Sequence, residues 1–159
     1  MPKITKSREQ VRPQISRATP QMRDLARRLM FYERPGDRST GATRARAFYF
    51  NEKLRPHLAT LYGTAGYRSL LSHALVLADA EVPWLREIHM KADGSLEGLE
   101  ALAGRLDPRE ILEGKIALLS ELLGALVAYI GPSLTLRMVG DVWPQISLSR
   151  TDFSDGGEA

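Results

Sequence analysis

The sequence predicts an all-α fold, in which five or six helices form one bundle around a central buried helix at about residues 108–130. Three observations lead to this prediction. The central stretch has helix start and stop signals at its ends, and 12 of the 15 residues from Ile116 to Ile130 are apolar. The flanking segments repeat apolar residues every three or four positions, as amphipathic helices do. A chain of 159 residues is long enough to bury the core of one such domain.

The central helix is delimited by residues with well-defined roles at helix ends. Asp107 is a typical N-cap, and Pro108 occupies the first helical position, where its missing N–H removes no hydrogen bond. Glu110 stands three residues after the cap, so its carboxylate can accept a hydrogen bond from the backbone of Asp107. Gly131 can leave helical geometry, and Pro132 cannot continue a helix. These residues predict a helix that ends at 130.

The central helix also has two different sides on a helical wheel. One side carries most of the leucines, whereas the other carries small residues, of which Ser120, Gly124 and Ala128 are spaced four apart. Small side chains at this spacing form a ridge along which a second helix can pack closely. That second helix belongs either to this chain or to a second copy in a symmetric dimer. The predicted interface consists of Ser120, Gly124, Ala128 and, beyond the helix, Trp143.

Amphipathic patterns predict further helices before the central one. The first begins at Thr19 and Pro20 and ends at a Pro-Gly turn. A second pattern covers 45–62, and a third follows a stop at Gly63. The predicted core residues are the apolar side chains that repeat at helical spacing: Met22, Leu25, Leu29, Phe48, Leu54, Leu58, Leu61, Tyr67, Leu70, Leu71 and Ala74.

Four segments are harder to assign. Pro56 predicts either a kink or a new helical segment that begins near Leu54. Residues 88–91 alternate apolar and polar side chains before a turn, which indicates one short extended segment. A modest helix is expected at 96–106. The pattern of 134–143 fits either a strand or a helix, and we expect a helix because a capping serine precedes it.

The net charge of +3 conceals an asymmetry along the chain. Residues 1–46 carry 12 Lys and Arg against 4 Asp and Glu, a net of +8, whereas residues 47–159 carry 10 against 15, a net of −5. We expect a flexible basic arm at 1–18, one helical domain at 19–146 and a disordered polar tail at 147–159. The basic part either keeps the chain soluble, docks on the acidic remainder or contacts nucleic acid.

The nucleic-acid alternative would use the loop 36–46 together with the arm. Arg38, Arg44 and Arg46 are its candidate phosphate contacts, because arginine binds phosphate bidentately. Two glycines of this loop have the spacing of a nucleotide-binding Walker A loop. That motif needs a lysine where this chain has Ala42, so the loop does not predict nucleotide binding.

Few sequence patterns indicate a catalytic or metal-binding function. The chain has no cysteine, which excludes disulfides, thiolate metal sites and cysteine nucleophiles. His57, His73 and His89 share no spacing with one another or with a carboxylate pair that predicts a metal site. His73 is expected to face solvent, which leaves phosphotransfer on this histidine as the least supported alternative. We expect no catalytic, cofactor-binding or metal-binding residues.

The sequence also gives an expectation for the cellular compartment of the protein. The first 20 residues are polar and basic, unlike a signal peptide, and we expect a cytoplasmic protein. The apolar run 116–130 is shorter than the roughly 20 residues that a membrane span needs, and Glu121 lies at its middle. We therefore expect no membrane association.

Three segments resemble a group of small bacterial proteins of unassigned function. They read LRPHLATLYGTAGYRSLLSHALVLADAEVPWL, IHMKADGSLEGLEAL and LVAYIGPSLTLRMVGDVWP, and the likeness covers about residues 48–144. The resemblance implies a compact, cytoplasmic, helix-rich protein. It implies no activity and no catalytic residues.

These observations favour a non-catalytic interaction or regulatory module. We expect it to self-associate, most simply as a homodimer, and to act through a protein partner whose identity the sequence does not specify. The hypothesis rests on the small-residue ridge and on the lack of a convergent catalytic set. Nucleic-acid binding through the arm and loop is the second hypothesis, and phosphotransfer is the third.

Overall fold

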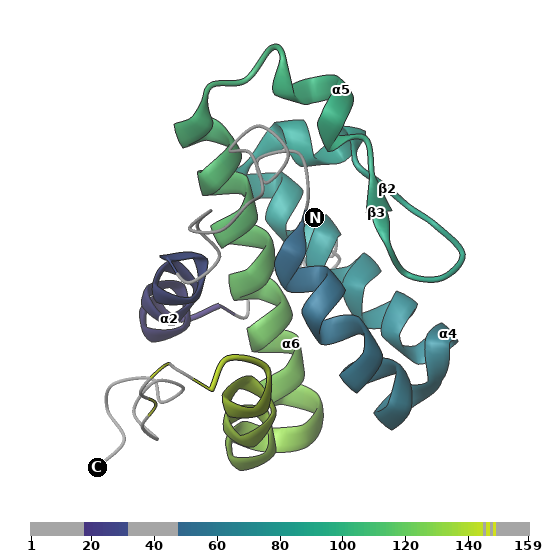
Figure 1. The fold of residues 1–159 in the computed structure, drawn as a ribbon, viewed down its shortest axis with the longest axis vertical. Helices are drawn as coiled ribbons and strands as arrows, with labels where there is room; N and C mark the ends of the chain where they lie inside the picture. Colours follow the sequence, from purple (N-terminus) through teal and green to yellow (C-terminus); the bar gives the residue numbers. More distant parts are fainter. Residues whose placement is uncertain (1–17, 32–47, 145, 147, 149–159) are drawn as a thin grey trace, which may run out of the picture.

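A computed structural model describes residues 18–31, 48–144, 146 and 148. Their four α-helices are α2 (Pro20–Phe31), α4 (Tyr49–Glu81), α5 (Leu99–Ala103) and α6 (Pro108–Val142). The 3₁₀ helix η2 (Pro83–Glu87) and two short strands, β2 (His89–Met90) and β3 (Leu96–Glu97), link α4 to α5 (Figure 1). The predicted all-α fold is confirmed for this part of the chain, but the predicted number of five or six helices is wrong.

The helix number differs because two predicted helix ends are breaks inside longer helices. Gly63 has φ 79° and ψ 164° within the 33-residue α4, and Gly131 has φ 86° and ψ 163° within the 35-residue α6. A side chain strongly disfavours this region of backbone space, so glycine is the residue that suits it. The helix resumes after each glycine. The sequence therefore predicted both breaks and a helical segment after each, and the helix number is lower because each pair of segments counts as one broken helix.

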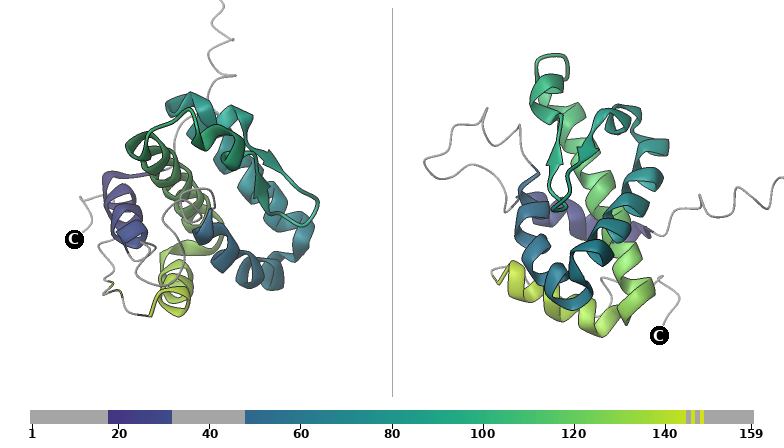
Figure 2. Two further views of the ribbon diagram at one scale, coloured as in Figure 1. Left: turned by 45° about the horizontal axis from the view of Figure 1, so that its top comes forward. Right: turned by 90° about the vertical axis from the view of Figure 1, so that its right-hand side faces the viewer.

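The first segment of α6, residues 108–130, forms the centre of the bundle (Figure 2). Its predicted start is confirmed in detail. The backbone N–H of Glu110 donates to the Asp107 carboxylate over 2.8 Å, and the backbone N–H of Asp107 donates to the Glu110 carboxylate over 3.0 Å. Every residue from Ile116 to Leu126 is buried, because α2 and α4 both pack against this segment.

Helix α2 begins at its predicted cap, since the Met22 backbone N–H donates to the Thr19 hydroxyl over 3.1 Å. Its buried face consists of apolar side chains at helical spacing: Met22, Leu25, Ala26, Leu29 and Met30. This face packs on α6.

Helix α4 confirms most of its predicted core but not all of it. Leu54 and Leu58 are completely buried, whereas the side chain of Leu61 is 60% exposed, so the core prediction was wrong for Leu61. Pro56 lies inside the helix without leaving helical geometry, and the one non-helical residue of α4 is Gly63. The break predicted near Leu54 and Pro56 therefore does not occur there.

The segment after α4 contains a small hairpin. The extended segment expected at 88–91 appears as β2, which pairs antiparallel with β3 in the register His89 to Glu97 and Met90 to Leu96. The pairing shortens the helix expected at 96–106 to the five residues of α5. The 134–143 segment is helical up to Val142, as expected. The basic arm up to residue 17, the loop 36–46 and most of the polar tail lie outside the described residues.

Candidate protein-interaction surface

The small-residue side of α6 is covered by the chain itself. Ser120 is completely buried, and its hydroxyl donates to the Ile116 carbonyl over 2.6 Å. Gly124 is also buried. The Arg23 guanidinium of α2 lies 3.9 Å from the buried Glu121 carboxylate, which places α2 along this side. Buried side chains cannot contact a second molecule, so Ser120 and Gly124 pack inside the chain, which was one of the two predicted alternatives, and do not form a dimer interface.

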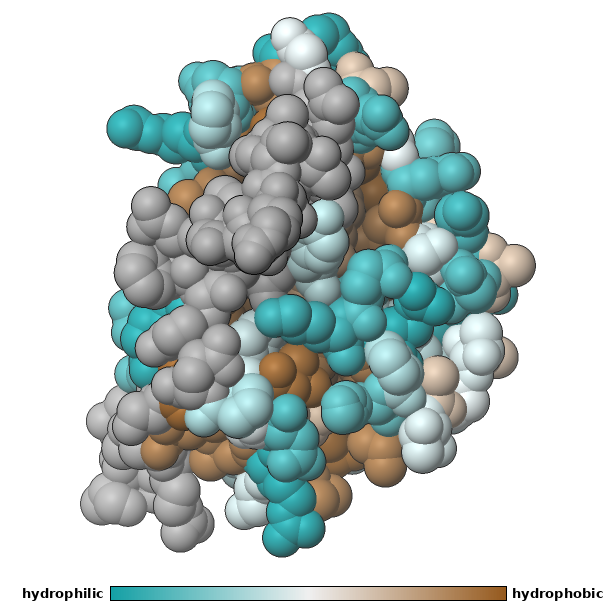
Figure 3. Space-filling model, in the orientation of Figure 1, coloured by the Kyte–Doolittle hydropathy of each residue, from teal (hydrophilic) through white to brown (hydrophobic). Residues whose placement is uncertain are grey.

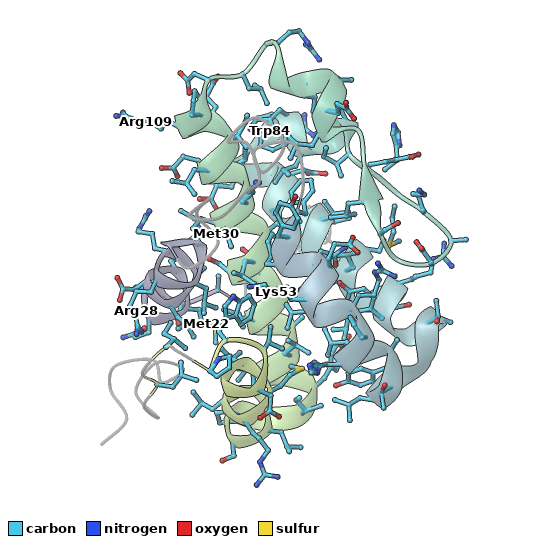
Figure 4. All side chains as sticks on the ribbon, in the orientation of Figure 1. Met22, Arg28, Met30, Lys53, Trp84 and Arg109 are labelled. Carbon is cyan, nitrogen blue, oxygen red and sulfur yellow. The ribbon has the colours of Figure 1, made fainter. Side chains whose placement is uncertain are left out.

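The other two predicted interface residues differ from each other. Trp143 is completely buried, with the Lys53 ammonium 5.6 Å from its ring centroid, so it also packs inside the chain. Lys53 is labelled in Figure 4. Ala128 is exposed, one residue before the exposed Tyr129. Of the four predicted interface residues, Ala128 alone is open to a partner.

Glu121 is the one buried carboxylate in the described residues. Arg23 also forms an ion pair with Glu81 over 2.5 Å, and therefore links α2 to both α4 and α6. Burying a charge is unfavourable unless a partner compensates it. This arrangement explains why an arginine, and not another apolar residue, occupies the edge of the α2 face.

A buried polar contact joins the two segments of α4 to the hairpin. The Tyr67 hydroxyl donates to the Asn51 side-chain oxygen, and the Asn51 amide donates to the Gly94 carbonyl over 3.1 Å. Burial raises the pKa of Tyr67 well above its usual range. Gly94 has φ 90°, and a Cβ there would lie 2.9 Å from the Tyr67 ring. All of these polar atoms have partners, which indicates a structural role.

The hairpin turn is held to α4 by charged side chains near its surface. Arg55 forms an ion pair with Glu52, and its guanidinium lies 3.7 Å from the Asp93 carboxylate. Hydrogen bonds from the hydroxyl and the backbone N–H of Ser95 lower the pKa of Asp93. The contact orients the turn.

The three histidines lie at different positions on α4 and β2. His57 and His89 are exposed, on α4 and β2, and His73 is partly buried on α4. Within the described residues, no group of three or more His, Asp or Glu side chains is placed to hold a metal ion.

The candidate nucleic-acid contacts Arg38, Arg44 and Arg46 lie outside the described residues. The described part of the chain carries 12 Lys and Arg against 13 Asp and Glu, a net of −1. The positive charge of the protein therefore resides in segments that the structure does not describe. No helix among the described residues is both long enough and apolar enough to cross a membrane.

Exposed apolar side chains gather around the two glycine breaks. Leu61 precedes Gly63 by two residues and is 60% exposed, and Tyr129 precedes Gly131 by two residues and is 65% exposed. Leu134, three residues after Gly131, is 52% exposed. These are three of the five large apolar side chains that are exposed in the described residues, the others being Val76 and Leu112.

Both breaks lie at the same end of the molecule. Figures 1 and 2 show the two helices turning there. Burial and the neighbouring Tyr129 raise the pKa of Tyr62. Since Tyr62 adjoins Gly63 and Tyr129 lies two residues before Gly131, the two breaks are close to each other. We name this surface the glycine-break end and define it by Leu61, Tyr129 and Leu134. Figure 3 shows apolar residues reaching the surface in the same lower part of the molecule. Single exposed apolar residues are ordinary, but several at one end of a molecule make that end a candidate contact site.

Sequence reasoning did not find the glycine-break end. It assigned Leu61 to the core because the residue continues the spacing of Leu54 and Leu58. The relevant signal was the position of large apolar residues within three residues of each predicted break. Where a helix changes direction, the side chains beside the turn lose the neighbours that a straight helix would give them.

No protein-family model, no curated protein and no solved structure matches this chain. The resemblance to small bacterial proteins therefore stays a prediction. The inference about function rests on the geometry alone.

Proposed function

We propose that this chain is a non-catalytic helical interaction module that self-associates and acts through protein contacts at the glycine-break end. One observation supports this proposal above the others: Leu61, Tyr129 and Leu134 are each more than half exposed around two breaks that lie together. Apolar area of this kind gains free energy when a partner removes it from water. The buried polar groups elsewhere serve the fold, and they leave this surface as the best candidate.

Sedimentation equilibrium of the full-length chain tests the proposal. The protein is measured from about 1 μM to about 1 mM, which covers association free energies of about −8 to −4 kcal/mol. We expect concentration-dependent association that the triple variant L61S/Y129S/L134S weakens at least about tenfold, since each serine removes roughly 1–2 kcal/mol of apolar burial.

The double variant V76S/L112S is the matched control, because Val76 and Leu112 are 45% and 44% exposed but remote in sequence from both breaks. It should associate like the unmodified protein. Equal association of the triple variant and the control would refute the role of the glycine-break end. A chain that is monomeric throughout the concentration range would refute self-association.

A further inference from the structure

We propose that the partner at this surface is a second copy of the chain, bound through the last segment of α6, residues 132–142, packed antiparallel about a twofold axis. This inference rests on the proposed function and specifies its partner and its contact. The contact is centred on Leu134, Arg137 and Asp141, with the twofold axis between positions 137 and 141, and it continues to Leu61 and Tyr129 at the glycine-break end.

The exposed face of this segment is short and consists of few residues. Thr135, Met138 and Val139 turn inward and are buried, whereas Leu134, Arg137 and Asp141 are exposed. Residues three or four apart lie one above another on a helix, so these three side chains form one stripe. The stripe begins beside Gly131 and is therefore continuous with the glycine-break end.

The charges on this stripe are unsatisfied within the described residues. None of the ion pairs there involves Arg137 or Asp141, although the two residues are four apart. An arginine before an acidic residue is the weaker order for such a pair within one helix. Asp141 also lies in the last turn of α6, which has no basic residue, and a carboxylate there opposes the helix dipole. A cation from outside the helix would relieve this unfavourable charge.

A twofold axis supplies that cation from an identical surface. In an isologous contact residue i of one copy meets residue j of the other, and residue j meets residue i. Antiparallel packing centred between positions 137 and 141 sets each Arg137 against the Asp141 of the second copy. The same operation sets one Leu134 at each end of the contact, beyond the two charged pairs. The stripe is thus complementary to itself in charge.

The contact area limits the affinity. Eleven helical residues span about 16 Å at 1.5 Å per residue, so the interface falls below the roughly 1,200 Å² of a standard complex. We therefore expect a reversible dimer with a Kd on the order of 100 μM, weakened by salt because the charged pairs lie at the surface.

Charge reversal at the two positions tests the inference by sedimentation equilibrium at low salt. R137D gives the stripe of each copy negative charges at both 137 and 141, and D141R gives it positive charges at both positions. We expect each single variant to dimerise about tenfold or more weakly than the unmodified protein, because two attractive pairs become repulsive. The double variant R137D/D141R restores opposite charges and should dimerise like the unmodified protein.

A mixture of R137D and D141R gives the most selective result. Every pair between these two variants is attractive, so the mixture should form a heterodimer at concentrations where each variant alone is monomeric. D141R also removes the unfavourable charge from the last turn of α6, so we expect this variant to keep its fold while it loses dimerisation. An unmodified dimer that neither single variant weakens would overturn this inference alone, whereas an unmodified chain that never dimerises would overturn the proposed self-association as well.

Discussion

The two long helices contain the same backbone break and use it differently. Gly63 in α4 and Gly131 in α6 have φ values of 79° and 86° with ψ near 164°. Both segments of α4 keep one face in solvent, and the Tyr67–Asn51 hydrogen bond joins them across the break. In α6 the break separates a segment whose middle, residues 116–126, is buried on every side from one with an exposed stripe. The glycine turns the chain, but the neighbouring elements decide which side chains remain exposed.

Truncation of leucines in the two helices should give the largest difference. Leu122→Ala removes a completely buried side chain from the centre of α6 and should lower the free energy of unfolding by about 2–5 kcal/mol. Leu61→Ala, in the exposed part of α4, should change it by less than about 0.5 kcal/mol. Urea denaturation followed by circular dichroism measures both. Comparable losses would mean that Leu61 is part of the core.

Substitution of the break glycines compares the two turns directly. Gly63→Ala and Gly131→Ala should each lower the free energy of unfolding by about 1–3 kcal/mol, because a side chain disfavours this backbone conformation even where space is open. Gly104→Ala is the control. Gly104 also has open space around it, but its φ is −74° and its ψ is −18°, which alanine adopts readily. We expect no loss at Gly104, and an equal loss at all three positions would contradict the explanation.

The two tyrosines beside the α4 break should respond unequally to loss of their hydroxyl groups. Tyr67→Phe leaves the Asn51 oxygen buried without its donor and should lower the free energy of unfolding by about 1–3 kcal/mol. The Tyr62 hydroxyl is buried without a hydrogen-bond partner among the described residues, so Tyr62→Phe should be close to neutral. Thermal denaturation of both variants checks the contrast, and a costly Tyr62→Phe would reveal a partner for that hydroxyl.

A shift to alkaline pH should change the stability of the protein less than the destabilising substitutions above. The folded-state pKa of Tyr67 is raised by burial above the value of about 10 in an unfolded chain. The free energy of unfolding is therefore unaffected by the ionisation of Tyr67 below about pH 10. It declines as the pH rises further, because Tyr67 then releases its proton in the unfolded state but retains it in the folded state. Melting temperatures between about pH 8 and about pH 11 should fall less steeply for Tyr67→Phe than for the unmodified protein. Parallel curves would contradict a raised pKa.

The predictable part of this structure is the part that depends on neighbours in the chain. The Thr19 cap, the Asp107 and Glu110 capping box and the two breaks were all correctly placed. Each follows from hydrogen bonds or backbone preferences within a few residues, which one sequence contains in full. The buried central helix was predictable as well, because its apolar run leaves no polar face.

The candidate site was much less predictable. The ridge of Ser120 and Gly124 correctly indicated close packing, but spacing alone did not decide between a segment of the same chain and a second copy. The pairing of β2 with β3 and the burial of Glu121 beside Arg23 also depend on elements that meet only in the folded chain.

By itself, the sequence determined the all-α class, the starts of α2 and α6 and the positions where α4 and α6 turn, because local backbone energetics set these features. Only the tertiary structure decided that α6 is covered around residues 116–126, that Leu61 faces water, and that Tyr129 and Leu134 lie at the same end as Leu61. Exposure depends on which distant segments pack against a residue, and this information is absent from the local pattern of a single chain.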